Sequence, residues 1–250
     1  MDREEIRDKA LKQTREKLRK PVEKDLFLVK TVQQLDKLNK NFREDVENFR
    51  DLYSQHFPEL VSELTDDERF VDMLDRFGVQ RSELEPFQEL AESSTGSAIN
   101  DEEKQIIEDI LSQLVETKET TERLEAYVEK EAKKEFQNLS GLLNPLLATR
   151  LVALAGGLDE LAKKPASTVQ MLGAEKALFR YLHGEGTPPK HGVLFNHPFV
   201  KNLPEEERGK MARFLANKAV MAARIDNYGD EDKSEGLREE ARERYEELKN

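Results

Sequence analysis

Cations recur along residues 205–225 at spacings that place them on one side of a helix. At roughly 100° per residue these positions fall within a sector of roughly 60°, and apolar residues such as Met211 and Leu215 lie about 130° around the helix. The apolar side predicts a face buried in a core, and the cationic side suits contacts to phosphate groups. An ordinary solvated face explains the cations nearly as well. The polar positions are Lys210, Arg213, Asn217 and Arg224.

A second group of candidate residues stands at the start of another predicted helix, at 173–182. Gly173 has no Cβ and precedes Lys176 and Arg180, so another backbone could approach it closely. Free N–H groups at a helix start also bind anions, which again suits a phosphate-bearing partner.

His197 is the third candidate, between Asn196 and Pro198 on a segment that we predict to be extended. An aromatic ring there could stack on an unpaired RNA base, as aromatic side chains do with splayed-out nucleotides. The alternative is a structural histidine whose ring is satisfied within the protein, and without other context that alternative is favoured.

The residue pattern does not support catalysis. The four histidines, at 56, 183, 191 and 197, include no i, i+4 pair, which is the spacing that puts two metal ligands on one helix face. The absence of cysteine excludes disulfides, thiolate metal sites and cysteine nucleophiles. Gly184 and Gly186 follow no predicted strand and lack the third glycine of a dinucleotide-binding loop. We therefore predict no catalytic residue, no metal site and no cofactor.

The charge is unevenly distributed along the 250 residues. Residues 141–229 hold 12 Lys and Arg against eight acidic residues, a net charge of +4. Because the whole chain has a net charge of −12, the remaining residues together carry −16. A mildly basic module in an acidic frame favours a polyanionic partner, because local charges act within a Debye length of about 8 Å. A mixed surface without a polyanionic partner is an equally good explanation. No segment approaches the ~20 apolar residues of a membrane span, and no signal-like run is present, so we expect a soluble protein without a membrane partner.

Two long helices precede the basic module. Apolar residues recur at steps of three and four along residues 24–56, and a second such repeat runs along 102–137. A helix of ~30 residues is marginal unless its apolar stripe is buried, so we predict that the two helices pair as an antiparallel coiled-coil hairpin. The first stripe is Leu28, Val32, Leu35, Leu38, Phe42, Val46, Phe49 and Tyr53, and the second is Ile107, Ile110, Leu114, Thr117, Thr121, Leu124 and Val128.

An insertion at about 57–100 separates the two long helices. We predict short helices in this insertion, because it contains signals for helix N-termini at Pro58 and at 65–67 and a signal for a helix C-terminus at Gly78. The sequence SSTGS at 93–97 predicts a flexible loop. The phenylalanines of this helical tip predict packing against the hairpin, with or without an additional surface for self-association.

These elements predict an all-α protein in three parts. A coiled-coil domain at 1–140 begins with a charged helix at 2–20 and carries the tip insertion. A compact helical module follows at 141–229, and a charged C-terminal helix occupies 230–250.

Three segments of the basic module carry a family resemblance: AGGLDELAKKPASTVQMLGAEKALFR at 155–180, PPKHGVLFNHP at 188–198 and RGKMARFLANKAVMAARID at 208–226. They closely resemble the Nop domain of archaeal box C/D guide-ribonucleoprotein core proteins. That family includes nucleolar core proteins and a pre-mRNA splicing factor of the tri-snRNP. The resemblance continues upstream through YSQHFPEL at 53–60, so it covers nearly the whole chain.

The resemblance implies an RNA–protein scaffold rather than an enzyme, one that supports guided 2′-O-methylation of RNA. It implies that the Nop module binds box C/D-type kink-turn RNA together with a small kink-turn-binding protein of the ribosomal-protein type. It also implies a homodimer formed through the coiled coil. The implied location is the cytoplasm of an archaeal-type cell, or the nucleus or nucleolus of a eukaryote.

The resemblance also assigns roles to individual residues. A GAEK motif implicated in particle assembly falls on 173–176, an ALFR motif near the guide–substrate duplex falls on 177–180, and the histidine of the family's YGVIFQHP-like segment corresponds to His197. The candidate RNA- and RNP-binding residues are Gly173, Ala174, Glu175, Lys176, Ala177, Leu178, Phe179, Arg180, Lys190, His191, Asn196, His197, Arg208, Lys210, Arg213, Asn217 and Arg224.

Some features depart from the family pattern. The N-terminal domain that holds the methyltransferase fibrillarin and a Lys-rich tail are both expected to be absent. Without that domain, fibrillarin recruitment is in doubt. His191 and Asn196 replace the more usual Tyr and Gln. Two alternatives stay open: a coiled-coil protein-interaction module whose Nop-like domain does not bind RNA, and an RNP protein like the pre-mRNA splicing factor.

Overall fold

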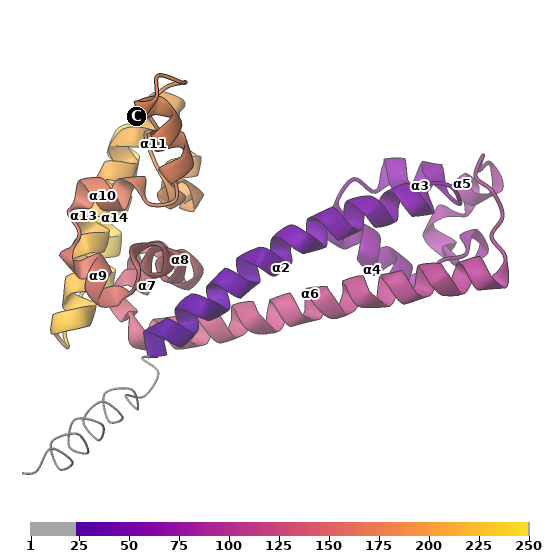
Figure 1. Cartoon of the computed structure of the whole chain (residues 1–250), viewed down its shortest axis with the longest axis horizontal. Helices are drawn as coiled ribbons and strands as arrows, with labels where there is room; N and C mark the ends of the chain where they lie inside the picture. Colours follow the sequence, from indigo (N-terminus) through magenta and orange to yellow (C-terminus); the bar gives the residue numbers. More distant parts are fainter. Residues whose placement is uncertain (1–23, 250) are drawn as a thin grey trace, which may run out of the picture. The chain divides into compact units, whose positions relative to one another are not determined.

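The computed structural model describes residues 24–249, and the predicted charged helix at 2–20 lies outside them. Every regular element of the described residues is a helix, so the predicted all-α class is confirmed (Figure 1). None of these helices is long and apolar enough to cross a membrane. The described chain divides into two compact units, which we call the first unit (34–125) and the second unit (24–33 with 126–249).

The first unit contains most of the two long helices and the insertion between them (Figure 1). Its elements are the C-terminal part of α2 (Lys24–Tyr53), α3 (Pro58–Glu63), α4 (Asp67–Phe77), η1 (Arg81–Glu83), η2 (Glu85–Phe87), α5 (Gln88–Glu92) and the N-terminal part of α6 (Asp101–Glu135).

The insertion supplies much of the core of the first unit. The α2 residues Phe42, Val46, Phe49 and Tyr53 are buried together with apolar residues of α3, α4 and α6. The buried Tyr53 hydroxyl donates a hydrogen bond to the Val79 carbonyl at 2.9 Å. The predicted packing of the insertion is thus confirmed, whereas the coiled-coil pairing of α2 and α6 stays a prediction. The insertion residues in this core are Phe57, Leu60, Leu64, Phe70, Val71, Leu74, Val79 and Leu84.

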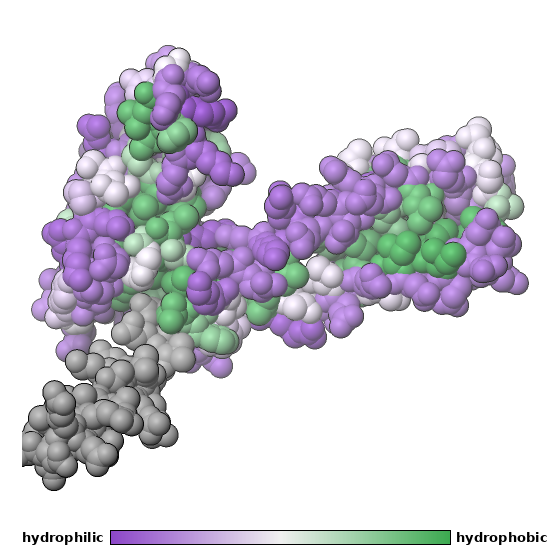
Figure 2. Space-filling model, viewed as in Figure 1, coloured by the Kyte–Doolittle hydropathy of each residue, from purple (hydrophilic) through white to green (hydrophobic). Residues whose placement is uncertain are grey.

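The predicted apolar stripe of α2 is buried except at Leu38, which is half-buried. The α6 stripe is less regular: Leu111, which the predicted repeat omits, is buried, and no residue of 115–127 is fully buried. Two large apolar side chains of the first unit, Leu52 and Ile106, are 43% and 51% exposed. Figure 2 shows an apolar patch on the visible face of this unit, as a self-association surface requires.

The predicted loop at 93–97 is confirmed, and hydrogen bonds attach it to α3, while its flexibility stays a prediction. The Glu59 carboxylate accepts hydrogen bonds from the Ser94 hydroxyl at 2.7 Å and from the Thr95 backbone N–H at 2.8 Å. These bonds lower the pKa of Glu59 to about 2, because they stabilise its charged form. A Cβ on Gly96 would lie 2.0 Å from the His56 carbonyl oxygen, so the loop also packs tightly against the end of α2.

The second unit is organised around its longest internal helix, α13 (Glu205–Tyr228), which packs against α7, α9, α10 and α14 (Figure 1). Its buried residues include Met211, Leu215 and Ala219, so the predicted core face of this helix is confirmed. The other elements are α7 (Gln137–Leu143), α8 (Pro145–Ala155), α9 (Leu158–Lys163), α10 (Ala166–Met171), α11 (Glu175–Leu182), η3 (Val193–Asn196), α12 (Pro198–Lys201) and α14 (Ser234–Lys249).

The end of α13 is joined to the start of α7 by a carboxylate. Asp226 accepts hydrogen bonds from the backbone N–H groups of Asn138 and Leu139, both at 2.9 Å, and from the Asn138 side chain at 2.8 Å. Helix α7 has no cap from its own preceding residue, so Asp226 satisfies N–H groups that would otherwise lack partners. Burial raises the pKa of this carboxyl group.

The C-terminal helix α14 shares the core of the second unit. Leu237 and Ala241 are buried, and the Tyr245 ring stacks on Phe199 with centroids 4.8 Å apart. The predicted extended segment at 192–200 is wrong, because these residues form the short helices η3 and α12. Pro198 occupies the first turn of α12, where a missing N–H costs nothing.

Candidate nucleic-acid interface

A cavity of about 980 Å³ opens on the second unit between α10, the link at 183–192, α13 and α14. Its lining carries four cations, from the link, α13 and α14, and two acids, Glu206 and Glu247. Met171 and Phe214 contribute apolar surface. The cationic residues are Lys190, Lys210, Arg213 and Arg244.

The link that carries Lys190 is fixed by backbone hydrogen bonds and by Gln170 of α10. The Gln170 side-chain amide donates to the Lys190 carbonyl at 2.7 Å, and the Gln170 carbonyl accepts from the Gly192 N–H at 2.8 Å. A Cβ on Gly192 would lie 1.9 Å from the Leu172 carbonyl oxygen, so only glycine permits this approach. Lys190 is therefore presented from a fixed backbone.

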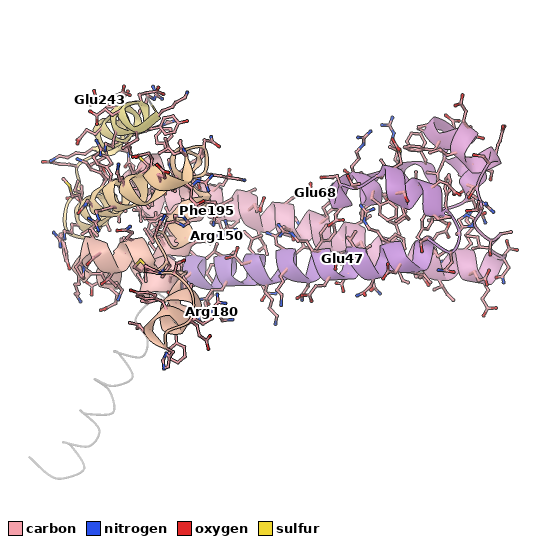
Figure 3. All side chains as sticks on the ribbon, turned by 90° about the horizontal axis from the view of Figure 1, so that it is seen from above. Glu47, Glu68, Arg150, Arg180, Phe195 and Glu243 are labelled. Carbon is pink, nitrogen blue, oxygen red and sulfur yellow. The ribbon has the colours of Figure 1, made fainter. Side chains whose placement is uncertain are left out.

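A second cavity, of about 440 Å³, adjoins the first and shares Pro188, Pro189 and Lys190 with it. It is lined on its far side by Ala177 and Arg180 of α11. Arg180 and Glu243 of α14 are seen on opposite sides of the second unit in Figure 3. The two adjoining cavities thus carry cations from α14, α13, the link and α11.

Helix α11 contains no buried residue, and several of its side chains face solvent. Lys176 and Arg180 are exposed, and Phe179 is 63% exposed, with its ring tilted by 35° against that of His183 at a centroid distance of 4.1 Å. Ala177 and Leu178 are half-buried. The predicted residues of this helix are thus accessible to a partner.

The turn before α11 depends on Gly173, whose φ of 84° is a left-handed conformation that favours glycine. The Gly173 N–H donates to the Glu175 carboxylate at 2.8 Å, and Ala174 is half-buried. A Cβ on Gly173 would lie 3.2 Å from Val193, so the close approach is made by the protein's own η3. The acidic side chain of Glu175 already occupies part of the helix start that we expected to bind an anion.

Only some residues of the predicted cationic face of α13 line the larger cavity. Lys210, Arg213 and Asn217 line the larger cavity, and Arg213 has no ion-pair partner among residues 24–249. Lys210 pairs with Glu207 at 2.7 Å, and the Asn217 side chain donates to the Arg213 carbonyl. Arg224 lies outside this cavity and donates to the Ala162 carbonyl at 3.0 Å, which ties α13 to α9.

The candidates on and after the link take different roles. The His191 ring stacks on Phe195 with centroids 4.8 Å apart, and burial lowers its pKa. The Arg208 guanidinium lies over the Phe195 ring, with its carbon 5.6 Å from the ring centroid, and donates a hydrogen bond to the Leu203 carbonyl at 2.8 Å. Asn196 is exposed. Arg208 thus stabilises the turn before α13.

His197 is a structural residue, and the predicted stacking on an RNA base is wrong. Its side chain is only 6% exposed, and its Nδ1 accepts a hydrogen bond from the Phe199 N–H at 3.1 Å, which caps α12. Because Nδ1 is an acceptor, the proton is on Nε2, which lies 3.3 Å from the Leu142 carbonyl and donates to it. The ring is thus held by contacts within the protein.

This environment predicts a pH-dependent stability. Burial lowers the pKa of His197 from 6.5 to about 4, and protonation of Nδ1 would also abolish the α12 cap. Between these values the unfolded chain binds a proton that the folded protein does not, so stability falls as pH falls from about 6.5 to about 4, by about 3 kcal/mol at most.

The measurement compares urea unfolding of the wild type with that of His197→Asn across this pH range. Asparagine is a good cap that does not titrate, so the wild type is expected to lose more stability than the variant as the solution is acidified. Parallel stability curves for the two proteins would contradict the assignment. His56, whose pKa burial also lowers, is present in both proteins and cancels.

Two contributors to the site have no signal in the sequence. Gln170 and Arg244 line the cavity although they lie far apart in the chain. Neither belongs to a cationic helix face or a glycine-rich turn. No group of three or more His, Asp or Glu side chains within residues 24–249 is arranged to hold a metal ion.

The sequence of this chain is similar to those of known proteins. The family model for Nop, whose description reads "snoRNA binding domain, fibrillarin", matches residues 34–247. A NOP5 family protein of Methanocaldococcus jannaschii is 35% identical over 83% of this chain and 53% of its own length. Nucleolar protein 56 of Homo sapiens is 34% identical over 88% of this chain and 40% of its own length, and nucleolar protein 58 of Debaryomyces hansenii is 34% identical over 90% and 48%.

A solved structure agrees with the sequence matches. The crystal structure of a fibrillarin/Nop5p complex contains a similar chain, with a TM-score of 0.54 and 27% identity over 98% of this chain and 78% of that one. This chain spans about half, or less, of the curated relatives named above. Because the family model spans both units and includes both cavities, the chain belongs to the Nop family.

Proposed function

We propose that this protein is a scaffold of a box C/D-type guide ribonucleoprotein. Its second unit binds kink-turn RNA together with a small kink-turn-binding protein of the ribosomal-protein type, and the assembled particle supports guided 2′-O-methylation of RNA. Its own role is to bind and position, without catalysing a reaction.

The main support for this proposal is that two adjoining cavities lined by cations lie within the part of the chain that matches the snoRNA binding domain model. Arginine and lysine on fixed backbone suit phosphate contacts, which supply most of the affinity of proteins for nucleic acid. Lys190 stands between the two cavities, with Arg213 on one side and Arg180 on the other. A continuous RNA backbone could contact all three.

The first unit has the features of a protein-interaction element. Its exposed Leu52 and Ile106 and its long helices support a homodimer formed through α2 and α6. The similar solved structure is a complex with fibrillarin, but we assign no described residue to fibrillarin itself. In a eukaryotic cell the proposed particle is nucleolar, and in an archaeal-type cell it is cytoplasmic.

The test is equilibrium binding of a labelled kink-turn RNA, with and without a kink-turn-binding protein, from about 50 to about 300 mM salt. If about three or four phosphates are contacted, log K is expected to fall with log salt with a slope of about −3 to −4. A kink-turn-disrupting base change in the same RNA is the matched control and is expected to abolish the three-component complex.

The test separates this function from the alternatives. A module that contacts only protein would bind the kink-turn protein equally well without RNA. Absence of any RNA-dependent complex at low salt would rule out the proposed scaffold.

A further inference from the structure

The C-terminal helix α14 forms one wall of the larger cavity. Its core-facing residues Leu237, Ala241 and Tyr245 fix one side of the helix against the second unit. Arg244, the residue before Tyr245, and Glu247 line the cavity. The helix that the sequence predicts as a separate charged tail thus contributes side chains to the candidate interface.

The position of α14 is well defined by packing. Lys218 of α13 forms an ion pair with Glu240, Leu248 packs on the core, and a Cβ on Gly141 would lie 2.5 Å from the Ser234 Cβ. The backbone of Arg244 is therefore held at a fixed place relative to the cations of α13.

Among residues 24–249, Arg244 pairs with one acidic group, and it remains partly open to the cavity. Its Nη1 lies 2.7 Å from the Glu247 Oε2, and its side chain is 36% exposed. An exposed pair of this kind at i, i+3 contributes little to stability and exchanges readily. A phosphate offers more acceptor oxygens in a geometry that matches the guanidinium.

The cavity receives positive charge from three elements. Lys190, Lys210 and Arg213 come from the link and α13, and Arg244 comes from α14. Met171 and Phe214 also line it and contribute apolar surface on which a sugar or base can rest. Cations from separate elements around an apolar surface suit an anionic strand.

We propose that Arg244 is a further phosphate-binding residue of the RNA interface, and that Glu247 holds its guanidinium at the cavity until a phosphate replaces the carboxylate. This inference rests on the proposed function of the second unit. It extends the interface from the predicted residues at 173–224 to the C-terminal helix.

The experiment measures binding of kink-turn RNA, with the kink-turn protein present, by the full chain and by Arg244→Gln. The variant is expected to bind about fivefold to tenfold more weakly at low salt, with a salt slope less steep by about 0.9, as for the loss of one phosphate contact. Arg242→Gln is the matched control: it makes the same change of charge on the same helix, roughly 160° around from Arg244. It is expected to bind like the wild type.

A reciprocal pair of variants tests the part assigned to Glu247. Glu247→Gln removes the competing carboxylate and is expected to tighten binding about twofold to threefold more than Glu243→Gln does. Glu243 is exposed, does not line the cavity, and lies on the side of α14 away from α13 in Figure 3. Thermal unfolding of all four variants checks that they fold like the wild type.

The outcomes are distinguishable. If the wild type binds RNA but Arg244→Gln matches Arg242→Gln in affinity and slope, the role of Arg244 is refuted while the scaffold function stands. If Arg244→Gln weakens binding of the kink-turn protein without RNA, the cavity receives an acidic protein surface, and the inference is also refuted. If the wild type binds no RNA, the proposed function fails together with this inference.

Discussion

Simultaneous replacement of Lys210 and Arg213 by glutamine is expected to weaken binding of kink-turn RNA about 100-fold. Both side chains line the larger cavity, and each charge-assisted hydrogen bond to phosphate contributes about 1.5 kcal/mol or more, roughly tenfold in affinity. The salt slope is expected to become less steep by about 2, because two fewer counterions are released. Titration of labelled RNA at several salt concentrations measures both quantities.

Lys233→Gln with Arg242→Gln is the matched control for this double variant. Lys233 and Arg242 are exposed cations of the same unit, each paired with a glutamate and neither lining the cavities. The control makes the same change in net charge and is expected to bind within about threefold of the wild type, since a distant exposed charge is largely screened. Equal losses in both double variants would show that the overall charge, and not the cavity, determines affinity.

Asp226→Ala is expected to destabilise the second unit by about 3 kcal/mol. The carboxylate accepts three hydrogen bonds from Asn138 and Leu139, and its loss leaves backbone N–H groups at the start of α7 without a partner. The net effect is smaller than three separate bonds would give, because removal of the partly buried charge also removes its desolvation cost, which raises the pKa of this group. The expected fall in Tm is about 6–12 °C, measured by helical circular dichroism.

Asp230→Ala supplies the control for this measurement. Asp230 is exposed and lies just beyond the end of α13, so its removal is expected to leave Tm almost unchanged. Asn138→Ala should destabilise as well, and the double variant with Asp226→Ala should cost less than the sum, because both changes remove the hydrogen bond between the Asn138 side chain and Asp226. Additive losses would show that the link between α13 and α7 does not act as one cluster.

Local periodicity was enough to predict the helices that organise the protein. The spacing of Val46, Phe49 and Tyr53 on α2 and of Met211 and Leu215 on α13 identified faces that are buried in the structure. These predictions succeeded because a helix brings residues three and four apart onto one side whatever packs against it. The coiled-coil pairing of the long helices depends on contacts between distant segments and stays a prediction.

Other features depend on contacts that local sequence does not reveal. The composition of 93–97 indicates a loop but not its contacts: Glu59, more than thirty residues earlier in the chain, forms hydrogen bonds with it. His197 stands in a segment that could be exposed, but the approach of α7 buries its ring and gives it a carbonyl partner. Gln170 and Arg244 reach the candidate interface only through tertiary packing.

The most direct measurement of the proposed RNA-binding role is the salt dependence of wild-type binding to kink-turn RNA in the presence of the kink-turn protein. We expect a three-component complex whose log K falls with log salt with a slope of about −3 to −4, and which disappears when the kink-turn is disrupted. A complex with the kink-turn protein whose affinity is the same with and without RNA, at every salt concentration, would contradict the role of the second unit as an RNA-binding scaffold.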